Sequence, residues 1–329
     1  MSTNSRVKKI GVLTSGGDAP GMNAAIRAVV RTSVFYDIEV IGVRGGYNGL
    51  IEGHFTKMGP RSVSNIINLG GTILKSARSS EFRTKEGRQQ AYDNCVAQGI
   101  EALVCIGGDG TFTGAQVFSE EFGIKVIGVP GTIDNDIYGT DNTIGFDTAL
   151  NTAMEAIDKI RDTATSHSRI FFIEVMGRDA GFIALNSGIA TGAVDILIPE
   201  TNDSLEGLFS TFEKSRKRGK NSSIVIVAEG ETLASTYELA QKTKEAFPDS
   251  DIRVAILGHI QRGGSPSCAD RVLASRLGFG AVTGLMKGLT NVMAGIRANQ
   301  LVYTPIEDAI KKHNEINQDL LQISEVLAL

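Results

Sequence analysis

Several residue types and patterns are missing from this chain of 329 residues, and each absence argues against a class of protein. Tryptophan is absent, and the three cysteines, Cys95, Cys105 and Cys268, show no CxxC spacing. This argues against disulfides and structural zinc and indicates a reducing compartment. No apolar run approaches the ~18–20 residues that a bilayer span requires, and the polar N-terminus has no signal-peptide pattern. The sequence therefore predicts a soluble, cytoplasmic protein with no membrane partner.

An excess of positive charge is also missing, because 33 Lys and Arg residues stand against 37 Asp and Glu residues, a net charge of −4. Bulk electrostatics therefore gives no support to a nucleic-acid partner. With 42% apolar and 21% charged residues the composition is that of a globular protein, and the length suggests about two domains. The 38 glycines predict tight turns and sites where the backbone approaches a ligand closely.

Short apolar segments alternate with longer amphipathic segments along most of the chain. Several short segments are apolar on both faces, as the central strands of a parallel sheet are. Strands are predicted over 8–15, 38–44, 102–107, 125–130, 169–175, 194–199, 223–229 and 253–259, with helices over 23–35, 149–163, 204–218 and 269–287. This alternation predicts two doubly wound, Rossmann-like three-layer α/β/α domains with mainly parallel sheets, and a turn-rich stretch at 138–146 indicates a boundary between them.

Glycine-rich turns follow two of the predicted strands, at the strand ends where open parallel sheets bind ligands. Gly16-Gly17 and the stretch 107–111 (GGDGT) each join a strand to a helix, which favours phosphate binding or reflects a tight connection that needs φ > 0. The chain has no GxxxxGK[ST] motif, and Gly114 comes one position too late for GxGxxG. Asp109 would repel a bare pyrophosphate, so its place in the loop is better explained if it holds Mg²⁺.

Two acids in the stretch PGTIDNDI, Asp134 and Asp136, are the candidates for proton transfer or metal binding. In an extended segment they project to the same side, and two carboxylates so placed repel unless a cation bridges them or one takes a proton. A solvent-exposed Asx-rich turn is the alternative, although the buried strand that leads into this segment argues against a plain surface loop. An aspartate here could accept a proton from a substrate hydroxyl.

Arginines near strand ends are the candidates for binding a phosphorylated substrate, because a guanidinium pairs bidentately with phosphate. Any one of them could instead be a surface or ion-pair residue. Together with His259 they predict a phosphate pocket: Arg169, Arg178, Arg253 and Arg262. A second phosphate contact is predicted in the small polar loop SARSSEFRT, at Arg78 and Arg83. The HExxH and GxSxG patterns of zinc proteases and serine hydrolases are absent.

Six long motifs occur in one order between residue 10 and about residue 280: TSGGDAPGMNAAIR, IGGDGT, PGTIDNDI, GTDNTIGF, EVMGR and LGHIQRGGSP. By these motifs the chain resembles the bacterial ATP-dependent 6-phosphofructokinase family. The resemblance implies transfer of the γ-phosphoryl group of ATP to the 1-hydroxyl of fructose 6-phosphate, giving fructose 1,6-bisphosphate and ADP, the committed step of glycolysis. Mg²⁺ is the implied cofactor, and phosphoryl transfer of this kind depends mainly on positioning and electrostatic stabilisation.

The resemblance also implies a domain organisation and an assembly. An ATP-binding domain is expected over 1–144 plus about 257–305, and a fructose 6-phosphate-binding domain over 145–256 plus about 306–329. The expected assembly is a homotetramer with allosteric regulation and with active sites shared between subunits.

Roles for individual residues follow from the same resemblance. Asp134 would be the base, Thr132 would hold the transferring group and Arg178 would stabilise its charge. Asp109 would bind Mg²⁺, and Asp136 would act on the metal or on alignment. The ATP site would comprise Gly16 (also catalytic), Gly17, Arg78, Ser79, Gly108, Asp109, Gly110 and Thr111. The substrate site would comprise Thr132, Ile133, Asp134, Met176, Gly177, Arg178, Glu229, His259, Ile260, Gln261 and Arg262, with Arg169 and Arg253 from a neighbouring subunit.

Two glycines discriminate between phosphoryl donors within the family. Pyrophosphate-using members typically carry a bulkier acid at the position of Gly110 and a lysine at the position of Gly131, so ATP is the favoured donor. A pyrophosphate-dependent phosphofructokinase, a non-catalytic nucleotide or sugar-phosphate sensor and an NAD-linked oxidoreductase are the alternatives. The sensor would need a broken catalytic set, yet Asp134, Arg178 and Asp109 are present. The glycine spacing disfavours the oxidoreductase.

An effector site between subunits binds ADP or phosphoenolpyruvate in bacterial members of the family. Three arginines match it here: Arg27, Arg31 and Arg161. However, Arg61 stands where tyrosine is usual, Val194 where a Mg²⁺-associated acid is usual, and Asn221 where lysine is usual. Since losing that acid and lysine would change metal binding and phosphate attraction, the sequence predicts an altered or absent response to these effectors.

Overall fold

A computed structural model describes residues 7–167, 169–201, 203–219 and 222–328, and the chain forms two compact α/β units. The first unit comprises Met1–Ile133, Ile137–Thr148 and Arg262–Asn314. The second unit comprises Asp134–Asp136, Ala149–Gln261 and Glu315–Leu329. Residues Asp134–Asp136, which include both candidate acids, therefore belong to the second unit, although the residues on either side of them belong to the first.

The first unit is built on a seven-stranded sheet in the order β11-β10-β5-β4-β1-β2-β3. Its five inner strands run parallel, and the two edge strands, β3 and β11, pair antiparallel to them. The strands are β1 (Lys9–Thr14), β2 (Glu39–Val43), β3 (Phe55–Met58), β4 (Ala102–Gly107), β5 (Lys125–Pro130), β10 (Val292–Arg297) and β11 (Gln300–Pro305). Every residue of β4 is buried, as expected for a central strand covered on both faces.

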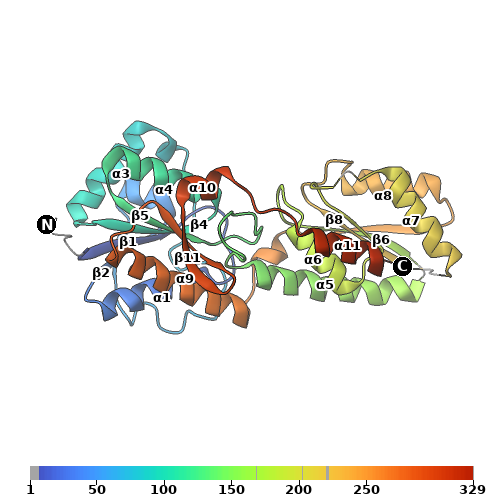
Figure 1. Ribbon diagram of the computed structural model, residues 1–329, viewed down its shortest axis with the longest axis horizontal. Coiled ribbons are helices and arrows are strands. Elements are labelled where there is room, and N and C mark those ends of the chain that lie inside the picture. The colour runs from blue at the N-terminus through green and yellow to red at the C-terminus, as the bar shows by residue number, and fades with distance from the viewer. Residues whose placement is uncertain (1–6, 168, 202, 220–221, 329) are drawn as a thin grey trace. The chain divides into compact units, whose positions relative to one another are not determined.

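Helices cover both faces of this sheet (Figure 1). One face carries α2 (Gly46–Glu52), α3 (Lys85–Gln98), α4 (Asp109–Phe122) and α10 (Ile306–Lys311), and the other carries α1 (Met22–Phe35) and α9 (Cys268–Met286). The 3₁₀ turn η1 (Glu81–Arg83) precedes α3. Phe112 packs against Gly128, where an added Cβ would lie 2.7 Å from the ring. Such close packing brings α4 down onto β5.

The second unit contains a four-stranded, wholly parallel sheet in the order β7-β8-β6-β9. Its elements are β6 (Arg169–Val175), β7 (Asp195–Leu197), β8 (Ser223–Ala228), β9 (Asp251–Ile256), α6 (Phe182–Thr191), α7 (Leu205–Lys217), α8 (Thr236–Ala246) and α11 (Gln318–Leu327). The 3₁₀ turn η2 (Gly258–Arg262) follows β9, and its last residue, Arg262, belongs to the first unit. Helices α7 and α8 pack on one face around Phe172 and Phe212, whose ring centroids lie 6.2 Å apart. Helix α5 (Phe146–His167) begins in the first unit and continues in the second.

These sheets confirm the predicted fold class of two Rossmann-like α/β units with mainly parallel strands. One predicted strand is displaced: the segment predicted at 253–259 begins at Asp251 and ends at Ile256. The reason is Gly258, whose φ of +53° starts the turn η2. Among the described helices, none has the length and apolarity needed to cross a membrane.

Asp195 on the edge strand β7 is a partly buried carboxyl that the sequence reading did not single out. Its Oδ1 accepts a hydrogen bond from the backbone N–H of Ile196 at 3.0 Å. Burial raises the pKa of Asp195 to about 6, and the nearby charge of Asp203 adds to this effect. An acid whose pKa is higher in the folded than in the unfolded state binds its proton more tightly when folded. Its ionisation therefore opposes folding.

We expect Asp195→Asn to increase the free energy of unfolding near pH 7 by roughly 1–2 kcal/mol, because asparagine keeps the acceptor and removes the buried charge. The wild-type penalty should be small at pH 4 and should develop as the pH rises from about 4 to about 6. Chemical denaturation at both pH values measures the difference. The exposed Asp249 is the control, whose replacement by Asn should change stability little at either pH. A variant less stable at pH 7 than at pH 4, relative to wild type, would contradict the analysis.

Candidate functional site

The glycine turns after β1 and β4 meet at the point where the strand order of the first sheet reverses. Strands β2 and β3 lie on one side of β1, and β4, β5 and β10 lie on the other. The backbone N–H of Ser15 donates to the carbonyl of Ile106 at 3.0 Å, and Thr111 Oγ1 donates to the carbonyl of Ser15 at 3.0 Å. In doubly wound sheets, ligands bind outside the strand ends at such a reversal.

Open space lies over the start of helix α4, next to these turns. Gly108 is the N-cap residue and Asp109 the first helical residue. A Cβ added to Gly110 would meet no atom within 4 Å, and one added to Gly108 would come no closer than 3.8 Å to Thr132 Cβ. Gly16 adopts φ +81°, a conformation that side chains rarely allow. Backbone N–H groups at a helix N-terminus favour an anion, so this part of the first unit suits a phosphate group.

Arg262 lies beside the first glycine turn, within the first unit. Its Nη1 donates to the carbonyl of Asp18 at 3.3 Å, and an added Cβ on Gly17 would lie 2.8 Å from that nitrogen. Ser76 Oγ donates to the carbonyl of Gly16, so the segment that leads to Arg78 is tied to the same turn. The structure therefore places a guanidinium next to the turn, whereas the resemblance assigns Arg262 to the sugar phosphate.

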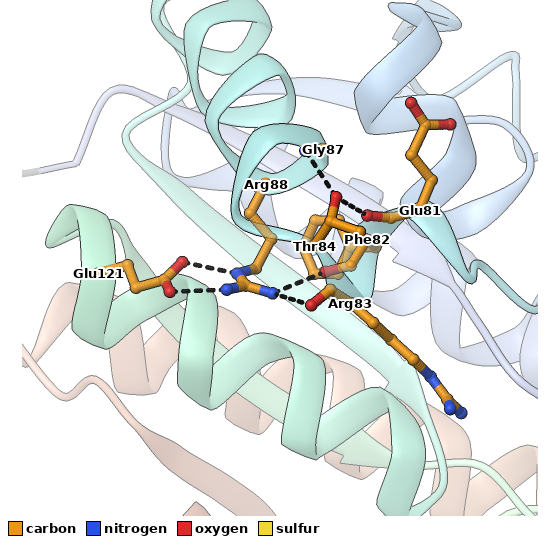
Figure 2. A network of polar contacts seen from close by, with 7 residues as sticks. All are labelled: Glu81, Phe82, Arg83, Thr84, Gly87, Arg88 and Glu121. Atoms are coloured by element: carbon orange, nitrogen blue, oxygen red, sulfur yellow. Dashed lines mark hydrogen bonds and ion pairs between the residues drawn. The ribbon is translucent and has the colours of Figure 1, made fainter.

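Arg88 holds the end of the second predicted phosphate loop (Figure 2). Its Nε and Nη2 donate to the two carboxylate oxygens of Glu121 at 2.6 and 2.7 Å. Its Nη1 donates to the carbonyls of Phe82 and Arg83 at 3.1 and 2.8 Å. The Arg83 side chain points away from this network (Figure 2). The hydrogen bonds from Arg88 lower the pKa of Glu121.

This network connects α3 and α4 to the turn η1, which follows the predicted ATP contacts Arg78 and Ser79. Arg78 is exposed, and Ser79 Oγ accepts the backbone N–H of Phe82 at 3.1 Å. The loop is therefore fixed at both ends, by Ser76 and by Arg88. Arg78 lies between these two fixed points with its side chain exposed.

The backbone that leads into the acidic stretch is held by a second loop of the first unit. Thr143 Oγ1 donates to the carbonyl of Thr132 at 2.7 Å, and the backbone N–H of Ile144 donates to the carbonyl of Pro130 at 3.0 Å. Ile133 is fully buried, and Asp134 is only 7% exposed. This burial excludes the alternative of a solvent-exposed Asx-rich turn for Asp134. Asp136 is half-buried.

In the second unit the ends of β6 and β8 are joined around Arg178. Its backbone N–H donates to Glu229 Oε2 at 3.1 Å, and an added Cβ on Gly230 would lie 2.2 Å from its carbonyl oxygen. Gly177 has φ +150° and Arg178 has φ +56°. This turn leaves the Arg178 side chain 67% exposed. Its Nε lies 3.6 Å from Asp179 Oδ2.

The end of β9 contributes the turn η2 to the same edge. Gln261 is fully buried, accepting the backbone N–H of Met176 at 3.3 Å and donating to the carbonyl of Gly258 at 3.1 Å. His259 and Ile260 are exposed on this turn. The structure thus brings together the predicted substrate residues Met176, Gly177, Arg178, Glu229, His259, Ile260 and Gln261, with Gln261 as the internal link.

Arg169 and Arg253 both pair with the carboxylate of Asp251. The sequence motifs did not indicate this acid. Asp251 lies 2.6 Å from Arg169 Nε and 3.1 Å from Arg253 Nε. The hydrogen bond from Arg169, supported by the charge of Arg253, lowers the pKa of Asp251. The available signal was the spacing: Asp251 and Arg253 are two residues apart on one strand and so share a face.

The three arginines of the predicted effector site belong to different units. Arg27 and Arg31 lie one turn apart on α1, and partial burial together with the charge of Arg31 lowers the pKa of Arg27. Arg161 lies on α5 in the second unit and donates to the carbonyl of Thr191. Burial lowers the pKa of Arg161.

Three positions depart from the family pattern: Val194, Arg61 and Asn221. Val194 is 3% exposed and belongs to the core of the second unit, so its side chain offers nothing to a metal. Arg61 is exposed, and Asn221 lies outside the described residues.

Comparison with known proteins adds independent findings. The protein family described as phosphofructokinase matches residues 9–285. The chain is 54% identical over 323 residues to ATP-dependent 6-phosphofructokinase 2 of Bacteroides thetaiotaomicron, covering 98% of this chain and 99% of that protein. It is 57% identical over 323 residues to ATP-dependent 6-phosphofructokinase 1 of Thermus thermophilus, covering 98% and 100%. Phosphofructokinase of Saccharomyces cerevisiae matches in structure with a TM-score of 0.88 at 40% identity, over 92% of this chain and 45% of the yeast chain.

We expect Arg88→Met to lower the free energy of unfolding by roughly 2–3 kcal/mol, because Glu121 and two carbonyls lose their charged donor. Urea denaturation measures the change. Lys85→Met is the matched control, since it also removes a cation from α3 but at an exposed position. Equal effects of the two substitutions would show that the network of Figure 2 adds nothing specific.

Proposed function

Because the chain belongs to the phosphofructokinase family, we infer that it is a glycolytic kinase that transfers the γ-phosphoryl group of ATP to the 1-hydroxyl of fructose 6-phosphate. The products are fructose 1,6-bisphosphate and ADP. The structural observation that supports this most directly is the pair of glycine turns at the sheet reversal, with Thr132 beside Gly108. Fixed backbone donors at that place suit a phosphoryl group, for which positioning and charge stabilisation dominate catalysis.

We propose the first unit as the ATP-binding domain. Gly16, Gly17 and the start of α4 would contact the phosphates, and the open space at Gly110 leaves room for a nucleotide. At Gly131 an added Cβ would lie 3.2 Å from Met22 Cε and from Ile106 Cγ2, so the lysine of pyrophosphate-using members would require these side chains to shift. Both positions support ATP as the donor.

The donor set fits a magnesium ion held largely by the nucleotide. Within the described residues, no group of three or more His, Cys, Asp or Glu side chains could hold a metal ion. Mg²⁺ suits such a site, because it is usually bound through one or two carboxylates together with substrate phosphates. Asp109 in the first turn of α4 would supply the carboxylate, and Asp136 is the second candidate. When bound, the ion neutralises charge on the phosphates.

Proton removal from the acceptor is the role proposed for Asp134. A substrate hydroxyl becomes a better nucleophile as a positioned carboxylate takes its proton. Asp134 is largely shielded from bulk water, which strengthens its electrostatic interaction with a bound hydroxyl. Thr132 would hold the transferring group, and the exposed guanidinium of Arg178 would stabilise its negative charge.

We propose the second unit as the fructose 6-phosphate-binding domain, with Met176–Arg178, Glu229 and the turn η2 as its contacts. Arg169 and Arg253 would serve the 6-phosphate of a neighbouring subunit in a homotetramer. Their shared partner Asp251 supports this role, because it orients two guanidinium groups toward one region of the surface.

Steady-state kinetics with ATP and fructose 6-phosphate tests the function, and Asp134→Ser tests the base. We expect the wild type to form ADP and fructose 1,6-bisphosphate, with ATP preferred over pyrophosphate at equal Mg²⁺. The variant should lose roughly 10²–10⁴-fold in kcat, the usual contribution of a general base. Preference for pyrophosphate would refute ATP as donor. A variant with wild-type kcat would refute the role of Asp134 but not the reaction.

We also propose that effector control is altered or absent. The burial of Val194 supports this, because no acid is available there for a metal-assisted effector phosphate. Initial rates at limiting fructose 6-phosphate, with and without ADP or phosphoenolpyruvate, should show weak or no response. Strong activation by ADP together with strong inhibition by phosphoenolpyruvate would contradict the proposal.

A further inference from the structure

Asp270, in the first turn of α9, is a buried carboxylate for which the proposed reaction has no role. It is 1% exposed and accepts three hydrogen bonds from a loop 122–125 residues earlier in the chain. Oδ1 accepts the backbone N–H of Gly145 at 2.8 Å. Oδ2 accepts the backbone N–H of Thr148 at 2.8 Å and the Thr148 hydroxyl at 2.5 Å. Both carboxylate oxygens are therefore used to hold the loop.

Ser267, the N-cap residue of α9, strengthens the same junction. Its backbone N–H donates to Thr148 Oγ1 at 2.9 Å, and its hydroxyl donates to Asp147 Oδ2 at 2.5 Å. Its Oγ also accepts the backbone N–H of Asp270 at 3.2 Å. The start of α9 and the first turn of α5 thus bind each other through several hydrogen bonds, all within the first unit.

The loop that Asp270 holds also supports the backbone at the candidate active site. Thr143 is fully buried and donates to the carbonyl of Thr132, and the N–H of Ile144 donates to the carbonyl of Pro130. Gly145 has φ +106°, and an added Cβ would lie 2.7 Å from Ala19. The loop therefore has little freedom to shift without moving the residues that it supports.

We propose that Asp270 is a positioning residue for phosphoryl transfer, acting through Gly145, Thr148 and Thr143 on the backbone of Thr132. The inference rests on the proposed function, in which Thr132 holds the transferring group. The chain passes into the second unit just after Ile133 and just after Thr148. Asp270 thus fixes the first-unit end of both connections, one of which leads directly to the proposed base.

Asp270→Asn tests this role while keeping the shape of the side chain. Asparagine cannot accept all three of these hydrogen bonds, because only its oxygen is an acceptor and its NH₂ group is a donor. We expect kcat to fall roughly 10–100-fold, the size of effect that a misplacement of about 1 Å produces. The KM for ATP should change little, because the glycine turns are held by separate hydrogen bonds between Ser15, Ile106 and Thr111.

Thr143→Val supplies a second test that removes one hydroxyl from the same chain of contacts. It should also lower kcat. The double variant should lose less than the product of the two single losses, since residues in one network are not additive. If Asp270→Asn does not fold, the kcat of Thr143→Val decides alone.

Asn94→Ala is the control for a purely structural effect. Asn94 donates to the carbonyls of Leu50 and Ile51 at 3.0 and 2.8 Å, in the same unit but outside this network. Asn94→Ala should lower the midpoint of thermal unfolding and leave kcat unchanged, when rates are measured well below that midpoint. Wild-type kcat in both Asp270→Asn and Thr143→Val would overturn the inference. A wild type without kinase activity would overturn the proposed function and the inference together.

Discussion

Close steric contact between the turns after β1 and β4 is the constraint on which the candidate site of the first unit depends. At Gly107 no side chain fits, because an added Cβ would lie 2.3 Å from Thr111 Oγ1 and 2.5 Å from the carbonyl oxygen of Ser15. This closeness lets Thr111 bond to Ser15 and brings Gly16 and Gly108 to one edge of the sheet. Since the strand order reverses between β1 and β4, the space outside their ends is open to a ligand.

The strand ends of the second unit are built differently. Arginines stand near its strand ends, each within reach of a carboxylate. Glu229 fixes the backbone of Arg178, and Asp251 pairs with Arg169 and Arg253. Backbone amides are rigid from the outset, whereas a guanidinium must be held by a partner before it can bind phosphate with a defined geometry. Arg169 and Arg253 therefore depend on a neighbouring acid.

At the junction of α5 and α9, the buried carboxylate of Asp270 connects the two helices through hydrogen bonds. A buried charge is tolerated when donors satisfy its oxygens, and Asp270 accepts three. Hydrogen bonds in such a network are directional, so they specify one arrangement of the loop more strictly than apolar packing does. Burial nevertheless raises the pKa of Asp270, as it raises that of Asp195 to about 6, so ionisation of either carboxyl has a cost that its donors only partly offset.

The amino-acid sequence by itself determined the local structure and the fold class. Alternating apolar and amphipathic segments predicted β4, β5 and β6 at their observed bounds, and motifs after the strands located the glycine turns and Asp134. Periodicity and turn chemistry act within a few residues, so sequence alone reveals them. Only the tertiary structure revealed that Asp270 holds Gly145 and that Asp251 pairs with Arg169, since these contacts join residues about 80 to 125 positions apart. Burial and hydrogen bonding between distant segments arise when the sheets and helices pack, and no local pattern encodes them.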